Sequence, residues 1–181
     1  MADRTGGEPV VAGAMEADLA GADLGSTVLE PGAIPVGLLP VNHPQLAQLF
    51  RYWDRKRAGR EMPSRADIRP EELGGLLGNL FMVDVLREGG VLRLRYRLVG
   101  TALTAVMQQE LTGKYIDEMP FLYRKFAMPA YREILRARRP TYKETNAFEG
   151  WLVIRYKRLL LPLASPDGER IDIVLGGIYT F

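Results

Sequence analysis

Three polar residues lie on stretches that otherwise have the composition of core strands: Tyr96, Tyr156 and Arg158. An arginine that points toward a core needs a partner for its charge. A polar or anionic ligand held by Arg158 and the tyrosines is one such partner. An internal ion pair with Glu144 or Glu149 is the alternative. Strand parity and helix position together predict a ligand pocket lined by Tyr96, Met107, Phe126, Tyr131, Tyr156 and Arg158.

A second group of polar residues alternates with apolar ones in the segment RLRYR, which contains Arg93, Arg95 and Arg97. One interpretation is a phosphate-binding stripe of a nucleic-acid-associated protein, extended by Arg155 and Lys157. The other is the outer face of a half-solvated sheet with Asp84 and Asp172 as local counter-charges. The second is favoured, because no recognition helix, zinc-finger spacing or aromatic ribonucleoprotein motif accompanies the arginines.

Several classes of chemistry are excluded by the residues that the chain lacks. It has no cysteine, which excludes disulfides, thiol nucleophiles and cysteinyl-flavin photochemistry. His43 is the single histidine, so a transition-metal site or a histidine-ligated haem in the central helices is not expected. Neither a nucleophile elbow nor a phosphate-binding glycine loop is present. We therefore expect a protein that is not an enzyme and whose cofactor, if it has one, is unknown.

The loop PSRADIRP carries Arg65 and Asp67, and an irregular loop that holds charges can form a binding site. It can also be a structural lock, in which Asp67 accepts backbone amides and Arg65 braces the neighbouring helices. The lock is the favoured interpretation.

Composition divides the chain into a tail, residues 1–40, and one domain, residues 41–181. The tail has seven glycines, four prolines, no aromatic residue and six acids against one base, so we expect most of it to be disordered. The domain carries about seven more bases than acids. No signal-peptide pattern opens the chain and no apolar run is long enough to span a bilayer, so we expect a cytoplasmic protein.

Helical periodicity begins after His43, with Pro44 suited to a first turn and an apolar stripe formed by Leu46, Leu49, Phe50 and Trp53. Two strands follow, at 81–85 and 92–99, and the Gly89-Gly90 turn between them predicts their register. That register pairs Asp84 with Arg95, Val83 with Tyr96 and Phe81 with Leu98.

Short helices are expected at 101–116, and a helical region interrupted at Pro129 over 119–138. Three more strands are predicted at 141–148, 151–163 and 170–179, with an Asp-Gly hairpin that pairs Leu160 with Leu175 and Pro162 with Ile173. The order predicts an α+β fold, in which a five-stranded antiparallel sheet has helices inserted between its second and third strands and a helical extension before its first strand.

The outer face of this sheet also carries apolar residues, so it needs a cover. The helix after Pro44 is the obvious cover, either on its own sheet or on the sheet of a second copy. The latter would make a homodimer, with an interface formed by Leu49, Phe50, Trp53, Trp151 and Val153.

A resemblance to a known family is carried by four blocks: YWDRKRAGREMPSRADIRPEEL, YRLVGTAL, ELTGKYIDE and RLLLPLASPDG. Together they resemble a PAS domain, and more narrowly the stand-alone PAS-type domains common in alphaproteobacteria. The resemblance covers about residues 42–179. It implies a five-stranded sheet cupped by short helices around a pocket, and signalling or ligand sensing, often through a dimer. It implies no particular ligand. We therefore expect a non-catalytic sensory module that binds a small molecule, a partner protein or both.

Overall fold

The computed structural model describes residues 26–30, 41–149 and 152–180, without the side chains of 147–149 and 152–154. The disorder expected for residues 1–40 falls outside the described residues for most of that segment. Within it, Thr27–Val28 forms strand β1, and the following Leu29 is buried. This part of the predicted tail is therefore attached to the domain.

A six-stranded antiparallel sheet forms the centre of the domain, in the order β1-β4-β5-β6-β2-β3. Its remaining strands are β2 (Leu80–Glu88), β3 (Val91–Val99), β4 (Thr141–Glu149), β5 (Leu152–Ala164) and β6 (Ile171–Thr180). The predicted α+β fold and the five predicted strands are confirmed. The sixth strand is β1, which pairs with β4 at the edge of the sheet.

The helices lie where the sequence predicts them. Helix α1 (Pro44–Arg57) precedes the sheet, followed by three 3-10 helices, η1 (Arg65–Asp67), η2 (Pro70–Glu72) and η3 (Gly74–Asn79). Between β3 and β4 lie α2 (Thr101–Met107), η4 (Ile116–Glu118) and α3 (Phe121–Ala137). The predicted interruption at Pro129 is wrong, because α3 continues through this residue, whose side chain is exposed. Among the described residues, no helix has the length and apolar character needed to cross a membrane.

The predicted strand registers hold near the turns and fail beyond them. Asp84 pairs with Arg95 as predicted, but Phe81 pairs with Val99 rather than Leu98. A bulge between Met82 and Val83 inserts one extra residue on β3 and shifts the ladder.

The β5–β6 hairpin fails in the same way. Leu160 pairs with Gly176 and Pro162 with Val174, one position away from the predicted partners Leu175 and Ile173. An irregularity between Leu163 and Ala164 causes this shift.

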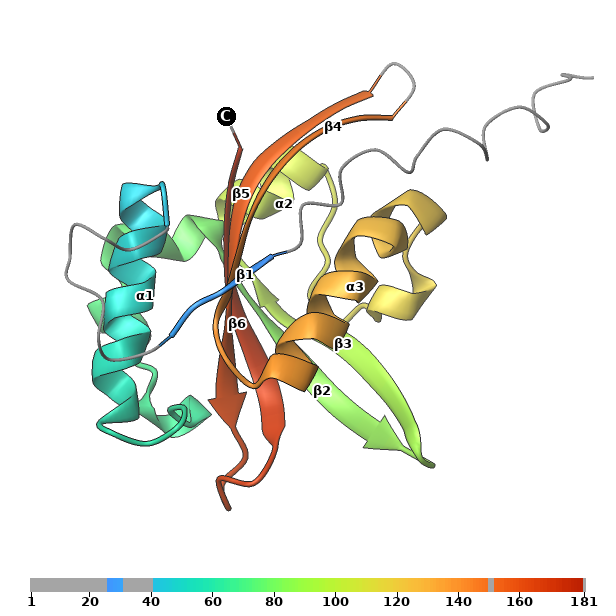
Figure 1. Cartoon of the computed structure of the whole chain (residues 1–181). Coiled ribbons are helices and arrows are strands. Elements are labelled where there is room, and N and C mark those ends of the chain that lie inside the picture. The colour runs from blue at the N-terminus through green and yellow to red at the C-terminus, as the bar shows by residue number, and fades with distance from the viewer. Residues whose placement is uncertain (1–25, 31–40, 150–151, 181) are drawn as a thin grey trace, which may run out of the picture.

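Helices α1 and α3 cover opposite faces of the sheet (Figure 1). Helix α1 packs on the sheet of its own chain. A Cβ placed on Gly177 of β6 would lie 2.8 Å from the side chain of Leu46 and 3.0 Å from that of Leu49. The indole nitrogen of Trp53 donates a hydrogen bond of 2.8 Å to the carbonyl of Pro162. The stripe predicted from periodicity is thus the inner side of this helix.

This packing corrects the predicted dimer interface. The side chains of Leu49, Phe50 and Trp53 are buried within the single chain, so a second copy has no access to them. Trp151 and the side chain of Val153 lie outside the described residues. A homodimer stays a prediction, and it requires a different surface.

Candidate ligand-binding site

The face of the sheet opposite α1 carries a cluster of polar side chains under α3. Strand β5 supplies Tyr156 and Arg158 at alternating positions, which point to one face. Thr145 of β4 pairs with Tyr156 and lies on that same face. Tyr96 comes from β3, and Tyr123 and Tyr131 come from α3. We call these six residues the Arg158 cluster: Tyr96, Tyr123, Tyr131, Thr145, Tyr156 and Arg158.

Contacts among the tyrosines hold the cluster together. The hydroxyl groups of Tyr96 and Tyr123 are hydrogen-bonded to each other. Tyr131 is close enough to Tyr96 to influence the pKa of its hydroxyl, and both Tyr96 and Tyr123 influence the pKa of Tyr131. The guanidinium carbon of Arg158 lies 5.8 Å from the centre of the Tyr156 ring. Strand β5, strand β3 and helix α3 therefore meet at this point.

Three tyrosines of the cluster, Tyr96, Tyr123 and Tyr131, stay neutral. Burial raises the pKa of Tyr96 and Tyr123 well above the ordinary tyrosine value, and it also raises the pKa of Tyr131. The positive charge of Arg158 acts in the opposite direction on all three pKa values but does not offset burial. Because the phenols remain protonated at neutral pH, they do not balance the charge of Arg158.

Arg158 has no counter-ion among the described residues. Only 7% of its surface is exposed, and in the described part of the chain no carboxylate lies within 4 Å of its guanidinium. The expected pairing with Glu144 is wrong, because Glu144 pairs with Lys157 on the opposite face of the strands. Glu149 pairs with Leu152, six residues along β5 from Arg158, a separation of about 20 Å.

Thr145 is the second unsatisfied group of the cluster. Its side chain is 6% exposed, and its hydroxyl oxygen has no hydrogen-bond partner among the described residues. A buried hydroxyl without a partner is unusual, because desolvation of a polar group must be compensated. The cluster therefore combines an uncompensated charge with a free hydrogen-bonding group.

The structure brings four of the six predicted pocket residues together. Tyr96, Tyr131, Tyr156 and Arg158 come together, and Tyr123 and Thr145 join them without having been predicted. Phe126 is half-buried on α3. Met107 is the last residue of α2 and is 41% exposed, so it does not belong to the buried cluster. Tyr123 could have been found from the sequence, because it precedes Tyr131 by eight residues and so shares its helix face.

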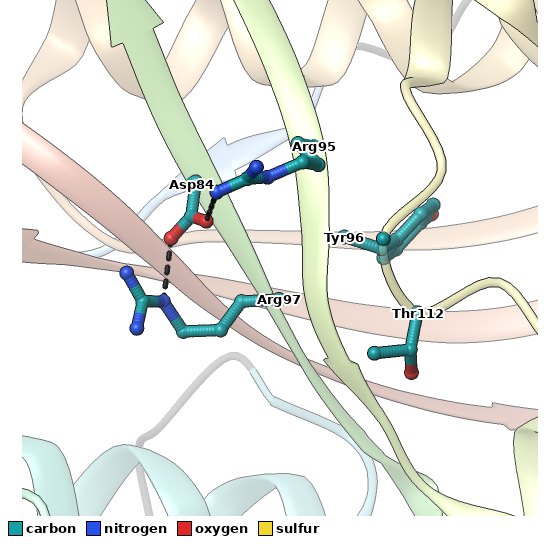
Figure 2. Close-up of a pocket in the computed structure, with 6 residues that line it drawn as sticks. Asp84, Arg95, Tyr96, Arg97 and Thr112 are labelled. Carbon is teal, nitrogen blue, oxygen red and sulfur yellow. Dashed lines mark hydrogen bonds and ion pairs between the residues drawn. The ribbon is translucent and has the colours of Figure 1, made fainter.

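The arginine stripe is neutralised by nearby acids. Figure 2 shows the buried carboxylate of Asp84 between Arg95 and Arg97, at 3.0 and 2.5 Å. These residues border a pocket of about 190 Å³ together with Tyr96, Thr112 and Gly113. Arg93 forms ion pairs with Asp117 at 3.0 Å and Glu118 at 2.7 Å. The expected counter-charge Asp172 instead pairs with Arg87 at 3.8 Å.

Arg155 and Lys157, the predicted extension of the stripe, are also engaged. Arg155 bonds Asn146 at 3.2 Å, and Lys157 bonds the carbonyl of Asn42 at 2.8 Å. Arg93, Arg95, Arg97 and Lys157 thus form ion pairs with carboxylates, whereas Arg155 bonds a neutral amide and keeps its exposed charge. One such arginine in the described part of the sheet is not a stripe of phosphate contacts.

Asp67 closes the loop before η1. Its carboxylate accepts hydrogen bonds of 2.8 Å from both the backbone amide and the hydroxyl of Ser64, and one of 2.9 Å from Arg60. Arg65 donates to the carbonyl of Ile68 at 2.9 Å. These contacts are local and connect neighbouring parts of the loop. Within the described chain, no group of three histidine or acidic residues could hold a metal ion.

Comparison with known proteins places this fold in a family. The family model of the PAS domain matches residues 41–179. Among solved structures, the PAS domain of BvgS from Bordetella pertussis is 17% identical, with 59% of this chain and 79% of that chain covered and a TM-score of 0.45. A fungal LOV domain photoreceptor is 13% identical, with coverages of 83% and 100% and a TM-score of 0.41. No curated protein matches the chain.

Proposed function

The chain belongs to the PAS domain family, whose members are sensory signalling modules, and we propose that it is a non-catalytic regulator that binds a small molecule at the Arg158 cluster. Binding is coupled to a partner protein, which receives the output. The proposal goes beyond family membership, because PAS pockets differ in what they hold and fold alone does not define a ligand.

One observation carries the proposal, namely the buried and uncompensated charge of Arg158. Taking a cation out of water is costly unless a counter-charge or several acceptors replace the water. The neutral tyrosines around it do not supply that charge. A bound molecule with a negative or strongly polar group would supply it, and the free hydroxyl of Thr145 offers a second contact to the same molecule.

The acid–base properties of the cluster support a non-catalytic role. A general acid or base is most effective when its pKa lies near the working pH. Burial raises the pKa values of Tyr96, Tyr123 and Tyr131 far from neutrality. The cluster is thus suited to holding a ligand rather than to transferring protons.

Helix α3 connects the site to the surface. It contributes Tyr123 and Tyr131 to the Arg158 cluster, and its other side faces solvent. A ligand that contacts these tyrosines favours one packing of α3 on the sheet over others, which is a shift of population between states. A partner that recognises α3 would then respond to the ligand.

The test is mass spectrometry of small molecules released when the purified protein is denatured. The compared proteins are the unmodified chain, Arg158→Met and the control Arg155→Met, which removes an arginine from an exposed position of the same strand. We expect one compound in stoichiometric amount from the unmodified chain and the control, and its loss from Arg158→Met. Equal amounts from all three proteins, or no compound from any of them, would contradict the proposed site.

A further inference from the structure

We infer that the ligand of the Arg158 cluster is a small monocarboxylate with an aromatic or apolar body. Its carboxylate accepts hydrogen bonds from the guanidinium of Arg158 and the hydroxyl of Thr145, and its body packs on the tyrosine rings. This inference rests on the proposed function and adds the chemical class of the molecule.

The guanidinium of Arg158 and the hydroxyl of Thr145 are placed so that one anion could contact both. Thr145 pairs with Tyr156, and Lys143 pairs with Arg158, so Thr145 and Arg158 are diagonal neighbours on one face of the β4–β5 ladder. Diagonal neighbours are about 7–8 Å apart, a distance that a carboxylate hydrogen-bonded to both side chains can span. The planar guanidinium presents parallel N–H groups that match the two oxygens of a carboxylate.

The local charge requires an anion. Lys143 is opposite Arg158 in the ladder and is itself a cation, so it does not neutralise Arg158.

The charge of the site favours a carboxylate over a phosphate. Arg158 supplies one positive charge that no carboxylate among the described residues balances, and the carboxylate of a ligand carries one negative charge. A phosphate carries up to two negative charges, and the second would be buried without a counter-charge from Arg158.

The walls of the site favour a flat or apolar body. Four of the six cluster residues are tyrosines, and the ring of Phe81 meets that of Tyr96 edge to face at 6.1 Å. Ile178 of β6 pairs with Arg158 and is half-buried beside it. Aromatic rings surround an aromatic guest favourably in stacked or edge-to-face arrangements. A body rich in hydroxyl groups would find few partners here.

The experiment is isothermal titration of the full chain, freed of bound compounds by unfolding and refolding, with benzoate, benzamide and inorganic phosphate. Benzoate and benzamide have the same ring and nearly the same size, and they differ in charge. We expect benzoate to bind at least tenfold more tightly than either of the other two. Arg158→Met should weaken benzoate at least tenfold, and the isosteric Thr145→Val several-fold. The control Arg155→Met should leave binding unchanged.

Arg158→Lys serves as a second variant, since it keeps the charge but loses the planar fork. We expect its affinity for benzoate to fall between those of the unmodified chain and Arg158→Met. Circular dichroism and melting curves establish that each variant is folded.

Equal binding of benzamide and benzoate, or tighter binding of phosphate, would overturn the carboxylate as the class of ligand. The proposed function would still stand if denaturation of the unmodified chain releases a compound that Arg158→Met lacks. Absence of any released compound together with absence of binding by all three probes would overturn both. A benzoate affinity that Arg158→Met leaves unchanged would place the carboxylate elsewhere and overturn the inference.

Discussion

Replacement of Arg158 by methionine should make the ligand-free protein more stable. Methionine keeps a long unbranched side chain of similar reach and removes the charge. In the ligand-free domain, Arg158 is 7% exposed, and the cation–π contact of its guanidinium with the ring of Tyr156 is a weak one at 5.8 Å. The substitution thus removes a desolvated charge and breaks no ion pair among the described residues.

The magnitude follows from two opposing contributions. The desolvation penalty of a buried ion in a protein is several kcal/mol, and exchange of buried ionic groups for apolar ones often stabilises a protein by about 1–4 kcal/mol. The contact with Tyr156 offsets roughly 0.5–2 kcal/mol of this, and the weak hydration of a guanidinium lowers the penalty further. We therefore expect Arg158→Met to raise the free energy of unfolding by about 1–2 kcal/mol. At about 2–4 °C per kcal/mol for a domain of this size, Tm should rise by roughly 2–8 °C.

Urea unfolding followed by circular dichroism measures the effect on protein that has been unfolded and refolded to remove ligand. Arg155→Met is the matched control, because Arg155 is exposed and bonds only Asn146 among the described residues. We expect the control to change stability by less than about 0.5 kcal/mol. If Arg158→Met instead loses more than about 1 kcal/mol, Arg158 has an internal partner and the argument for a ligand anion fails.

Three further substitutions test other parts of the fold. Gly176→Ala should lose roughly 1–3 kcal/mol of unfolding free energy, because the new Cβ would lie 2.0 Å from the ring of Phe81. The control Gly75→Ala should lose little, because its new Cβ meets nothing within 4 Å. Similar losses for the two variants in urea unfolding would contradict this prediction. Trp53→Phe should lose roughly 1–3 kcal/mol of unfolding free energy in the same assay, since the buried carbonyl of Pro162 loses its donor. An unchanged urea midpoint would count against this hydrogen bond. Burial raises the pKa of Asp67, but its hydrogen bonds and a nearby arginine have a larger effect and lower this pKa. The contribution of Asp67 to the stability of the fold is therefore present above about pH 4 and is lost as the pH falls through the folded-state pKa. A series of unfolding curves from pH 6 to 2 should accordingly show a smaller loss of stability in Asp67→Asn, and parallel profiles would refute the assignment.

The sequence predicts the sheet well where turn chemistry determines the register. Gly89-Gly90 correctly sets the pairs near the β2–β3 turn, including Asp84 with Arg95. Beyond Met82 the prediction fails, because a bulge is a single extra residue that the apolar alternation does not reveal. The extra residue is Arg97, whose side chain bonds Asp84 together with that of Arg95.

The candidate site is predictable on its strands and less so on its helices. Strand parity alone brings Tyr96, Tyr156 and Arg158 to one face, because the period of a strand is fixed at two. Tyr123, which precedes the predicted break at Pro129, is missed, whereas Tyr131 beyond it is predicted. Since α3 runs through Pro129, the two tyrosines share one face.

Close packing on both faces of the central strand β6 depends on two glycines, Gly176 and Gly177. A glycine inside a strand often marks a site where another group approaches the backbone closely. Successive residues of β6 point to opposite faces, so Gly177 admits the leucines of α1 while Gly176 admits the ring of Phe81 on the other side. The central strand is thus fitted for close packing of both layers within one chain. The two glycines predict from sequence that a group packs closely on each face of β6, and the bond from Trp53 to Pro162 shows that on one face this group is the helix of the same chain.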